Sequence, residues 1–207
     1  MSEPNEPVLR PETAGAPPEA PDQKKREETG LAGDLFTWLQ ALTFALVIIM
    51  IAFTFFGRII GVDGHSMEPT LQHRDMLLLQ CAGYTPRQGD VVVLHKSFSA
   101  TGEPIVKRVI ATGGQSVHID YGSSTVYVDG QPLDEPYLGE AMLQPGSSTM
   151  QGTDWEIPDG SVFVMGDNRN NSSDSREESL GPVDNRYVLG RALVVLFPFS
   201  HFGSIDK

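Results

Sequence analysis

The most prominent feature of the hydrophobic pattern is a long uncharged run near the N-terminus, Leu35–Phe56. As a helix, its 22 residues would extend about 33 Å at about 1.5 Å per residue, enough to cross a hydrocarbon core of about 30 Å. Trp38 lies near one end of the run and Phe55 and Phe56 lie at the other, where aromatic side chains suit the membrane interfaces. The pattern therefore predicts a single N-terminal transmembrane helix.

Two other interpretations of this run were weighed. A buried core helix of a water-soluble domain would carry a polar stripe facing solvent, and Leu35–Phe56 has none. A cleaved signal peptide would have a shorter apolar region, a basic leader and a small-residue cleavage site after it. The leader here is acidic and no such site follows Phe56, so we predict a permanent anchor at residues 35–56.

The segment before the anchor, residues 1–34, has the composition of a disordered tail. It holds 6 of the 15 prolines, many charges and almost no aliphatic residues. Such a segment cannot bury enough apolar surface to offset the entropy lost on ordering.

Basic residues flank the anchor unequally. Lys24, Lys25 and Arg26 precede it, whereas Arg58 and Arg74 follow it within a similar distance. The positive-inside rule then favours a cytoplasmic N-terminus. This orientation would place residues 57–207 outside the cytoplasm, on the far side of the cell membrane.

Beyond Phe56 the pattern changes to short apolar or alternating runs, each bounded by Gly, Pro, Asp or Asn, which is typical of β-strands. Asp129–Gly130 accepts positive φ at little cost and predicts a hairpin turn across Val128–Gln131. The fold class is therefore predicted as mostly β, with one helix followed by a β-rich domain at 57–207. The runs are Met76–Leu79, Asp90–Leu94, Ile105–Ile110, Val117–Ile119, Thr125–Val128, Ser161–Met165 and Ala192–Phe197.

Composition narrows the function classes. A net charge of -12 argues against a nucleic-acid partner, because phosphate binding needs clustered Lys and Arg. The single cysteine, Cys81, cannot form an internal disulfide and lies in no recognisable site. No His/Cys/Asp cluster in the sequence suggests a metal, so we expect neither metal nor cofactor.

Three segments carry groups suited to catalysis. The first, Gly61–Leu71, presents Ser66 in a loop with glycine and proline near it. In the second, Glu103–Ile110, strand alternation places Lys107 on the same face as Ile105 and Val109. Desolvation there would lower the lysine pKa, although an edge strand with two solvated cations is the favoured interpretation of this segment when it is taken alone. The third, Val164–Arg176, is rich in small polar groups and does not match a calcium loop.

Taken together, these segments resemble the type I signal peptidase family, serine proteases that use a Ser/Lys dyad. The resemblance extends from the anchor to near the C-terminus. It rests on motifs that follow one another behind the anchor: Ser66-Met67-x-Pro69-Thr70-Leu71, Gly89-Asp90-Val91-Val92, Lys107-Arg108-Val109, Gly166-Asp167-Asn168-Arg169 and Ser172-x-Asp174-Ser175-Arg176.

The resemblance implies a role for several residues. Ser66 would be the nucleophile and Lys107 the general base, with the backbone N–H of Ser66 as oxyanion donor. Ser172 would orient the lysine. Asp174 and Arg176 would shape the site. Met67 would contribute to a small substrate pocket, and residues 117–157 would form a small inserted β-lobe.

Two positions near Ser66 bear on this assignment. Some members of the family have a hydroxyl residue two positions before the nucleophile as a second oxyanion donor, and this chain has Gly64 there. His65 adjoins Ser66, but adjacent residues rarely adopt the geometry of a Ser–His pair, so lysine is preferred as the base.

The predicted function is membrane-bound removal of signal peptides from exported precursor proteins, with those precursors and membrane lipid as partners and no nucleic acid. One alternative is a dedicated Ser/Lys peptidase for a pilus or conjugation precursor. Another is a catalytically inactive, membrane-tethered β module that only binds partners.

Overall fold

The computed structural model describes residues 31–95, 103–144 and 152–205. The predicted tail, residues 1–34, lies outside this part of the chain except for its last four residues. Those four residues belong to a helix, α1 (Leu31–Phe56), which begins four residues earlier than the predicted start at Leu35. Asp34 lies in its first turn, where a carboxylate stabilises the positive end of the helix dipole.

α1 is long and apolar enough to span a membrane over Gly33–Ile51. This stretch has a mean hydropathy of 1.9, and none of its residues is buried by the rest of the protein. Phe36 and Trp38 are 69% and 76% exposed. Large apolar side chains exposed along so much of a helix are typical of a membrane-spanning segment. The boundary between the two structural units of the chain falls inside this helix, between Thr43 and Phe44.

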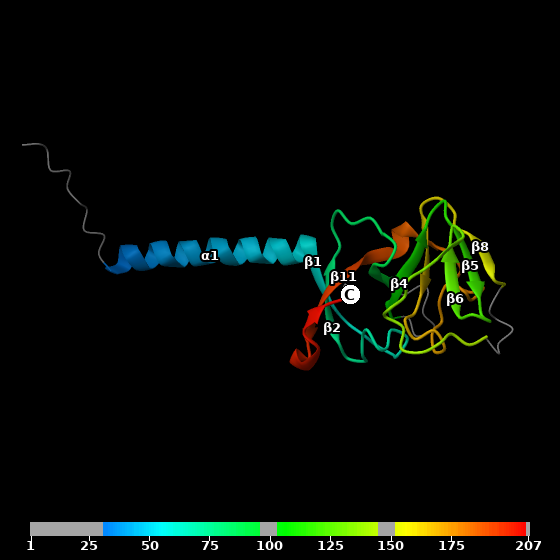
Figure 1. Ribbon diagram of the computed structural model, residues 1–207. Coiled ribbons are helices and arrows are strands. Elements are labelled where there is room, and N and C mark those ends of the chain that lie inside the picture. The colour runs from blue at the N-terminus through cyan, green and yellow to red at the C-terminus, as the bar shows by residue number, and fades with distance from the viewer. Residues whose placement is uncertain (1–30, 96–102, 145–151, 206–207) are drawn as a thin grey trace, which may run out of the picture. The chain divides into compact units, whose positions relative to one another are not determined.

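After α1 the chain forms a curled antiparallel sheet of eight strands, which confirms the predicted mostly-β class (Figure 1). The strand order is β1-β2-β11-β3-β4-β9-β10, with β12 paired to β11. The strands are β1 (Gly57–Gly61), β2 (Met76–Gln80), β3 (Val91–Leu94), β4 (Ile105–Thr112), β9 (Ser161–Met165), β10 (Val183–Asp184), β11 (Val188–Phe197) and β12 (Gly203–Ser204). Short 3-10 helices, η2 (Asn185–Tyr187) and η3 (Phe199–His201), flank β11.

A second antiparallel sheet is inserted between β4 and β9, in the order β7-β6-β5-β8. Its strands are β5 (Ser116–Asp120), β6 (Thr125–Val128), β7 (Gln131–Pro132) and β8 (Asp154–Glu156). The predicted hairpin turn is confirmed: Val128 pairs with Gln131, and both Asp129 and Gly130 have positive φ. Figure 1 shows β5, β6 and β8 side by side, next to β4.

Each predicted strand run forms a strand, but several strands were not predicted. β1, β7, β8, β10 and β12 have at most five residues each, and β1 shows no strict alternation of burial. β11 begins four residues before the predicted Ala192 and contains register shifts that curl the sheet. Such short or irregular strands are set by their neighbours rather than by their own sequence.

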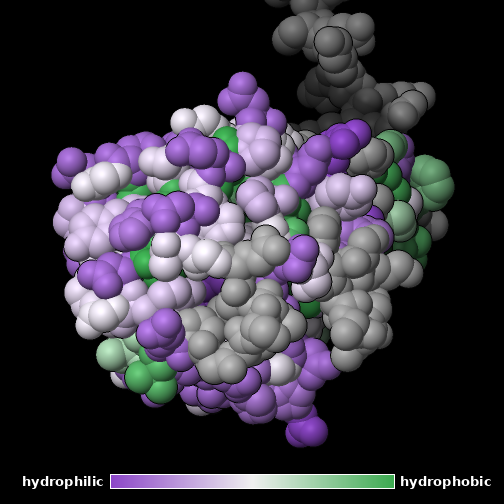
Figure 2. Space-filling model, turned by 90° about the vertical axis from the view of Figure 1, so that its right-hand side faces the viewer, coloured by the Kyte–Doolittle hydropathy of each residue, from purple (hydrophilic) through white to green (hydrophobic). Residues whose placement is uncertain are grey.

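Three buried clusters hold the β-rich part together. The first packs residues of β2, β3 and β11 around Met67 and Leu71. The second joins the small sheet to β4 and β9 through residues such as Phe163 and Ile119. The third lies on the other face of β3, β4 and β9, and includes Val92. On the face of the β-rich part that Figure 2 shows, the coloured residues are mostly hydrophilic.

The small sheet is attached to the large one where two chain segments run close together. Gly114 N–H donates to the Ile157 carbonyl at 2.8 Å, and Ile157 N–H donates to the Gln115 carbonyl at 2.9 Å. Gly113 lies so close to the returning segment that a Cβ there would be 2.8 Å from the Pro158 carbonyl oxygen and the Gly160 nitrogen. The insertion therefore leaves and rejoins the large sheet at one point, and β4 stays paired with β9 as far as Thr112 and Val162, with one register shift between Val109 and Ala111.

We predict that Gly113→Ala destabilises the β-rich part by about 1–3 kcal/mol, because the added methyl group overlaps backbone atoms that cannot move aside. Chemical denaturation of the purified protein in detergent measures the change. Gly203→Ala is the matched control, since a Cβ at Gly203 meets nothing within 4 Å. Equal stability of the two variants would contradict this account of the junction.

Candidate active site

Ser66 lies in the loop that joins β1 to β2. Two backbone hydrogen bonds close the ends of this loop, from Val62 N–H to the Asp75 carbonyl and from Arg74 N–H to the Val62 carbonyl. Met67 and Leu71 point into the first core cluster and are almost fully buried. Ser66, which precedes Met67, stays partly exposed. The loop therefore has a fixed shape that holds the serine hydroxyl at the surface.

Lys107 lies in β4, which runs between β3 and β9 rather than at a sheet edge. The alternative of an edge strand with two solvated cations is thus wrong: Lys107 and Arg108 are each 3% exposed. Lys107 pairs with the fully buried Val92, and directly paired residues share a face of the sheet. Lys107 Nζ donates to Ser66 Oγ at 2.6 Å.

The surroundings of Lys107 favour its neutral form. Burial lowers its pKa from 10.5 to about 8, and the positive charge of Arg176 acts in the same direction. Asp174, Asp167 and Glu177 raise it by a smaller amount. About a tenth of Lys107 is therefore neutral at pH 7, compared with about one part in three thousand for an unperturbed lysine.

Arg108, next to Lys107, points to the other face and is held by Asp167. Its guanidinium donates to both carboxylate oxygens, at 2.8 and 2.7 Å. Thr70 Oγ1, from the loop that carries Ser66, donates to the same carboxylate at 2.5 Å. Asp167 therefore ties the strand of the lysine to the loop of the serine.

Ser172, Asp174 and Arg176 form a second buried polar group. Asp174 and Arg176 make a bidentate ion pair, with Nε–Oδ1 and Nη2–Oδ2 distances of 2.8 and 2.9 Å. Burial opposes the charge on Asp174, but the hydrogen bonds and charge of Arg176 outweigh it and hold the Asp174 pKa below its ordinary value. Ser172 Oγ donates to Asp174 at 2.8 Å.

Residues 35–197 of the chain match the family described as signal peptidase, peptidase S26. The chain belongs to this family. It is 37% identical over 175 residues to a probable signal peptidase I-1 of Synechocystis sp., a match covering 80% of this chain and 84% of that protein. It is 31% identical over 189 residues to a signal peptidase I of Bacillus licheniformis, covering 88% and 99%.

A solved structure of a signal peptidase I from Enterococcus faecalis is 28% identical, with a TM-score of 0.41, over 55% of this chain and 98% of that one. The family membership confirms the resemblance drawn from the motifs, and it makes this chain a hydrolase, a serine endopeptidase of the signal peptidase I type.

The geometry at His65 and Gly64 bears on the choice of base and of oxyanion donor in this signal peptidase. His65 is exposed, its Nδ1 lies 2.7 Å from Glu68 Oε1, and Ser66 Oγ is bonded to Lys107 instead. Gly64 has a φ of +99°, which disfavours any residue with a side chain. A hydroxyl residue at this position would therefore be strained.

Met67 is buried in the core rather than exposed on the wall of an open pocket. It is 1% exposed and lies in the first core cluster with Val62 and Val106. A contribution of Met67 to a substrate pocket stays a prediction, as does the orientation of Lys107 by Ser172.

Residues of the Asp134–Leu143 segment also support the site, and the sequence analysis did not identify them. Glu135 forms a buried ion pair with Arg169, and the Tyr137 ring lies 3.9 Å beneath the Arg108 guanidinium. Asn170 Nδ2 donates to Glu140 at 2.8 Å. Nothing in the local pattern signals these contacts, since their partners are more than 25 residues away.

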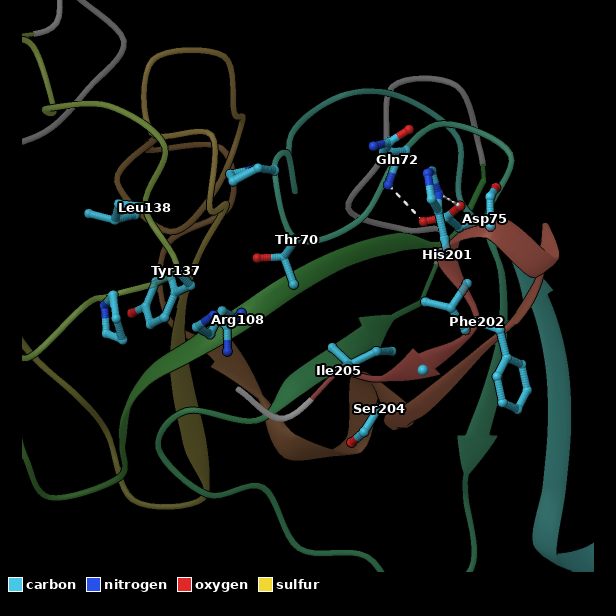
Figure 3. A pocket seen from close by; sticks show the side chains of 15 residues that line it. Thr70, Gln72, Asp75, Arg108, Tyr137, Leu138, His201, Phe202, Ser204 and Ile205 are labelled. Carbon is cyan, nitrogen blue, oxygen red and sulfur yellow. Dashed lines mark hydrogen bonds and ion pairs between the residues drawn. The ribbon is translucent and has the colours of Figure 1, made fainter.

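A cavity of about 550 Å³ is lined by Arg108 but by neither Ser66 nor Lys107. Figure 3 shows Thr70, Tyr137 and Arg108 at one end and His201 near Asp75 at the other. A smaller cavity of about 320 Å³ is lined by Glu68, Asn168 and their neighbours. Within the described residues no group of three or more His, Cys, Asp or Glu could hold a metal ion.

We predict that Asp174→Asn destabilises the protein by about 3–5 kcal/mol, because it leaves the Arg176 guanidinium buried without its counter-charge. The free energy of unfolding in denaturant tests this. Asp184→Asn is the matched control: Asp184 and Arg186 form the same pair at the same spacing, but on the surface. That variant is expected to unfold as the parent does. A similar loss in both variants would show that burial of the Asp174 pair does not matter.

Proposed function

We propose that this chain removes signal peptides from exported precursor proteins, with Ser66 as nucleophile and Lys107 as general base. The observation that carries the proposal is the 2.6 Å contact between Lys107 Nζ and Ser66 Oγ, made by a lysine that is 3% exposed. The relatives named signal peptidase I support the substrate class.

In the first half of the reaction, neutral Lys107 takes the proton from Ser66 Oγ as this oxygen attacks the carbonyl carbon of the scissile bond. The carbonyl oxygen becomes an oxyanion and accepts a hydrogen bond from the Ser66 N–H. Collapse of this intermediate breaks the C–N bond, and the leaving amine takes the proton from the Lys107 ammonium. The product is an ester between Ser66 and the signal peptide.

In the second half, Lys107 takes a proton from a water molecule that attacks the ester carbonyl. The intermediate expels Ser66 Oγ, which recovers its proton from Lys107. The signal peptide leaves with a free carboxylate. The same lysine therefore acts as base and then as acid in each half, which requires a pKa close to the working pH.

Ser172, Asp174 and Arg176 have supporting roles in this proposal. The Asp174–Arg176 pair nearly cancels its own charge, so neither residue dominates the field at Lys107. Gly166 N–H donates to Asp174 at 3.0 Å, which links the pair to the end of β9 beside the site. Ser172 would accept a hydrogen bond from Lys107 through a free lone pair of its hydroxyl.

The substrate would bind as an extended strand beside β4. β9 pairs with β4 only from Arg108 onward, where Arg108 faces Met165. On that side, Ile105–Lys107 have no strand partner among the described residues. An extended peptide can pair with this unpaired stretch of β4 through main-chain hydrogen bonds, which would bring its scissile bond near Ser66.

We propose that α1 anchors the enzyme in the cell membrane with the N-terminus in the cytoplasm and the β-rich domain outside. The exposed apolar length of α1 supports the anchor, and the basic run Lys24–Arg26 supports the orientation. Precursor proteins are embedded through their own apolar segments. Confinement of enzyme and substrate to one membrane raises their effective concentration.

The contact between Lys107 and Ser66 also disfavours an inactive β module. A dead copy has no chemical need for a buried lysine with a lowered pKa in contact with a serine hydroxyl. A peptidase dedicated to a single precursor would have the same dyad, and only its substrate range would differ.

We predict that Ser66→Ala and Lys107→Met each reduce precursor cleavage by at least about 10³-fold, because either change removes the dyad. Methionine keeps the buried aliphatic stem of the lysine. Cleavage of several unrelated precursors in lipid vesicles is measured beside thermal unfolding. Ser173→Ala, which changes an exposed serine in the loop after β9, is the control, and this variant should cleave as the parent does. Activity near the parent level in either dyad variant would contradict the proposal.

We also predict that kcat/KM rises with pH through a midpoint near 8. Lys107 is cationic and inactive as a base below its pKa of about 8, and neutral and active above it. Initial rates from pH 6 to 10 give the profile. Re-assay at pH 7.5 after incubation at each pH removes any effect of unfolding. A midpoint near 6.5 would instead indicate a histidine base, and a flat profile would exclude titration of the base in this range.

A further inference from the structure

Asn168, just after β9, makes two hydrogen bonds to the backbone around Ser66. Its side-chain Nδ2 donates to the His65 carbonyl at 3.1 Å, and its main-chain N–H donates to the Ser66 carbonyl at 3.0 Å. The carbonyl oxygen can only accept, so the side-chain amide must present its nitrogen to it. The peptide units on both sides of Ser66 are thus held by one residue.

The peptide unit held by the side chain is the one that contains the Ser66 N–H. A peptide group is planar and trans, so its C=O and N–H point in opposite directions. Fixing the His65 oxygen therefore fixes the direction of the Ser66 N–H. A hydrogen bond to the oxygen also polarises the amide and strengthens the N–H as a donor.

The Ser66 N–H is available for a substrate oxygen. Within the described part of the chain it donates to no acceptor, and Ser66 is partly exposed. Gly64, two residues earlier, has no side chain that might share the task. The stabilisation of an oxyanion therefore depends strongly on the orientation and strength of this single backbone donor.

Asn168 is itself well placed to act as a rigid support. The preceding residue, Asp167, is 2% exposed and is bound at both oxygens by Arg108. Asn171 N–H donates to the Asn168 carbonyl at 3.1 Å, which closes the turn on the other side. The backbone of Asn168 is thus fixed on both sides, by Asp167 before it and by the turn to Asn171 after it, while its side chain contacts His65.

We propose that Asn168 is a positioning residue for the oxyanion site, acting through the His65–Ser66 peptide unit. This inference rests on the proposed function, because it requires Ser66 to be the nucleophile. Glu68 N–H also donates to the His65 carbonyl, at 3.3 Å, but this longer bond lies within the same loop. Among the described residues, the bond from Asn168 is the one that links this carbonyl to the rigid end of β9.

Side-chain substitutions isolate this role, because the main-chain bond from Asn168 to Ser66 remains in each of them. The variants are Asn168→Ala and Asn168→Asp, with Asn171→Ala as the matched control. Asn171 belongs to the same loop and is exposed, and its hydrogen bond to the Asn168 carbonyl uses only the main chain. The full-length enzyme is assayed in lipid vesicles with a precursor protein.

We expect kcat to fall about 10- to 100-fold in Asn168→Ala, somewhat less than the loss of a whole oxyanion donor. Asn168→Asp should fall further, because its carboxylate repels the His65 carbonyl oxygen instead of donating a hydrogen bond to it. KM and the pH midpoint should stay near the parent values, since substrate binding and Lys107 are untouched. Affinity for a peptide aldehyde, whose adduct with Ser66 resembles the intermediate, should fall with kcat, while affinity for the cleaved signal peptide should not.

Several results would overturn the inference. These are an unchanged kcat in both Asn168 variants, an equal loss in Asn171→Ala, a loss confined to KM, or a shifted pH midpoint. If both variants lose their thermal transition, Asn168 is a structural residue and the inference is wrong. Inactive Ser66→Ala and Lys107→Met with a fully active Asn168→Ala would reject this inference alone, whereas an active dyad variant would reject the proposed function itself.

Discussion

The burial of Lys107 against Ser66 is the constraint on which the site depends. Lowering the lysine pKa from 10.5 to about 8, mainly by burial, corresponds to a net destabilisation of the ammonium form by roughly 3 kcal/mol. The lysine pKa stays low because the buried acids near Lys107 pair with arginines instead. Asp167 is bound by Arg108 and Asp174 by Arg176, so among the described residues Lys107 has no ion pair that would return its pKa to the ordinary range. The ion pairs around Lys107 thus preserve its lowered pKa as well as the shape of the site.

The fold brings the partners together from distant parts of the chain. Ser66 comes from the β1–β2 loop, Lys107 from β4, and Asp167 and Asn168 from the end of β9. Direct pairing of β4 with β9 fixes the lysine relative to Asp167, and Asp167 and Asn168 then hold the serine loop by contacts with Thr70 and His65. The small sheet lies between Lys107 and Asp167 in sequence. Its closed junction at Gly113 lets it extend away without separating the two strands.

Several features could be predicted because they arise from local pattern. The apolar length of α1, the alternating strands and the Asp129–Gly130 turn depend on neighbouring residues only, and the structure confirms them. The start of α1 was missed because Asp34 was counted with the charged tail, although a carboxylate is favourable in a first helical turn. The short strands β7, β10 and β12 were missed because two residues carry no readable period. Motif resemblance placed Ser66, Lys107 and Asp174 in one site, but no contact between them follows from spacing alone.

The sequence by itself determined the membership of the signal peptidase family, the mostly-β class and a helix long enough to span a membrane, because each is written in residue type and order. Only the tertiary structure decided that Lys107 and Arg108 are both buried, and that Met67 packs into the core. It also decided that Glu135 pairs with Arg169, that Tyr137 packs against Arg108, and that Asn168 bonds to the backbone around Ser66. These facts depend on which strands become neighbours, and burial and pKa are properties of that assembled environment rather than of any local segment.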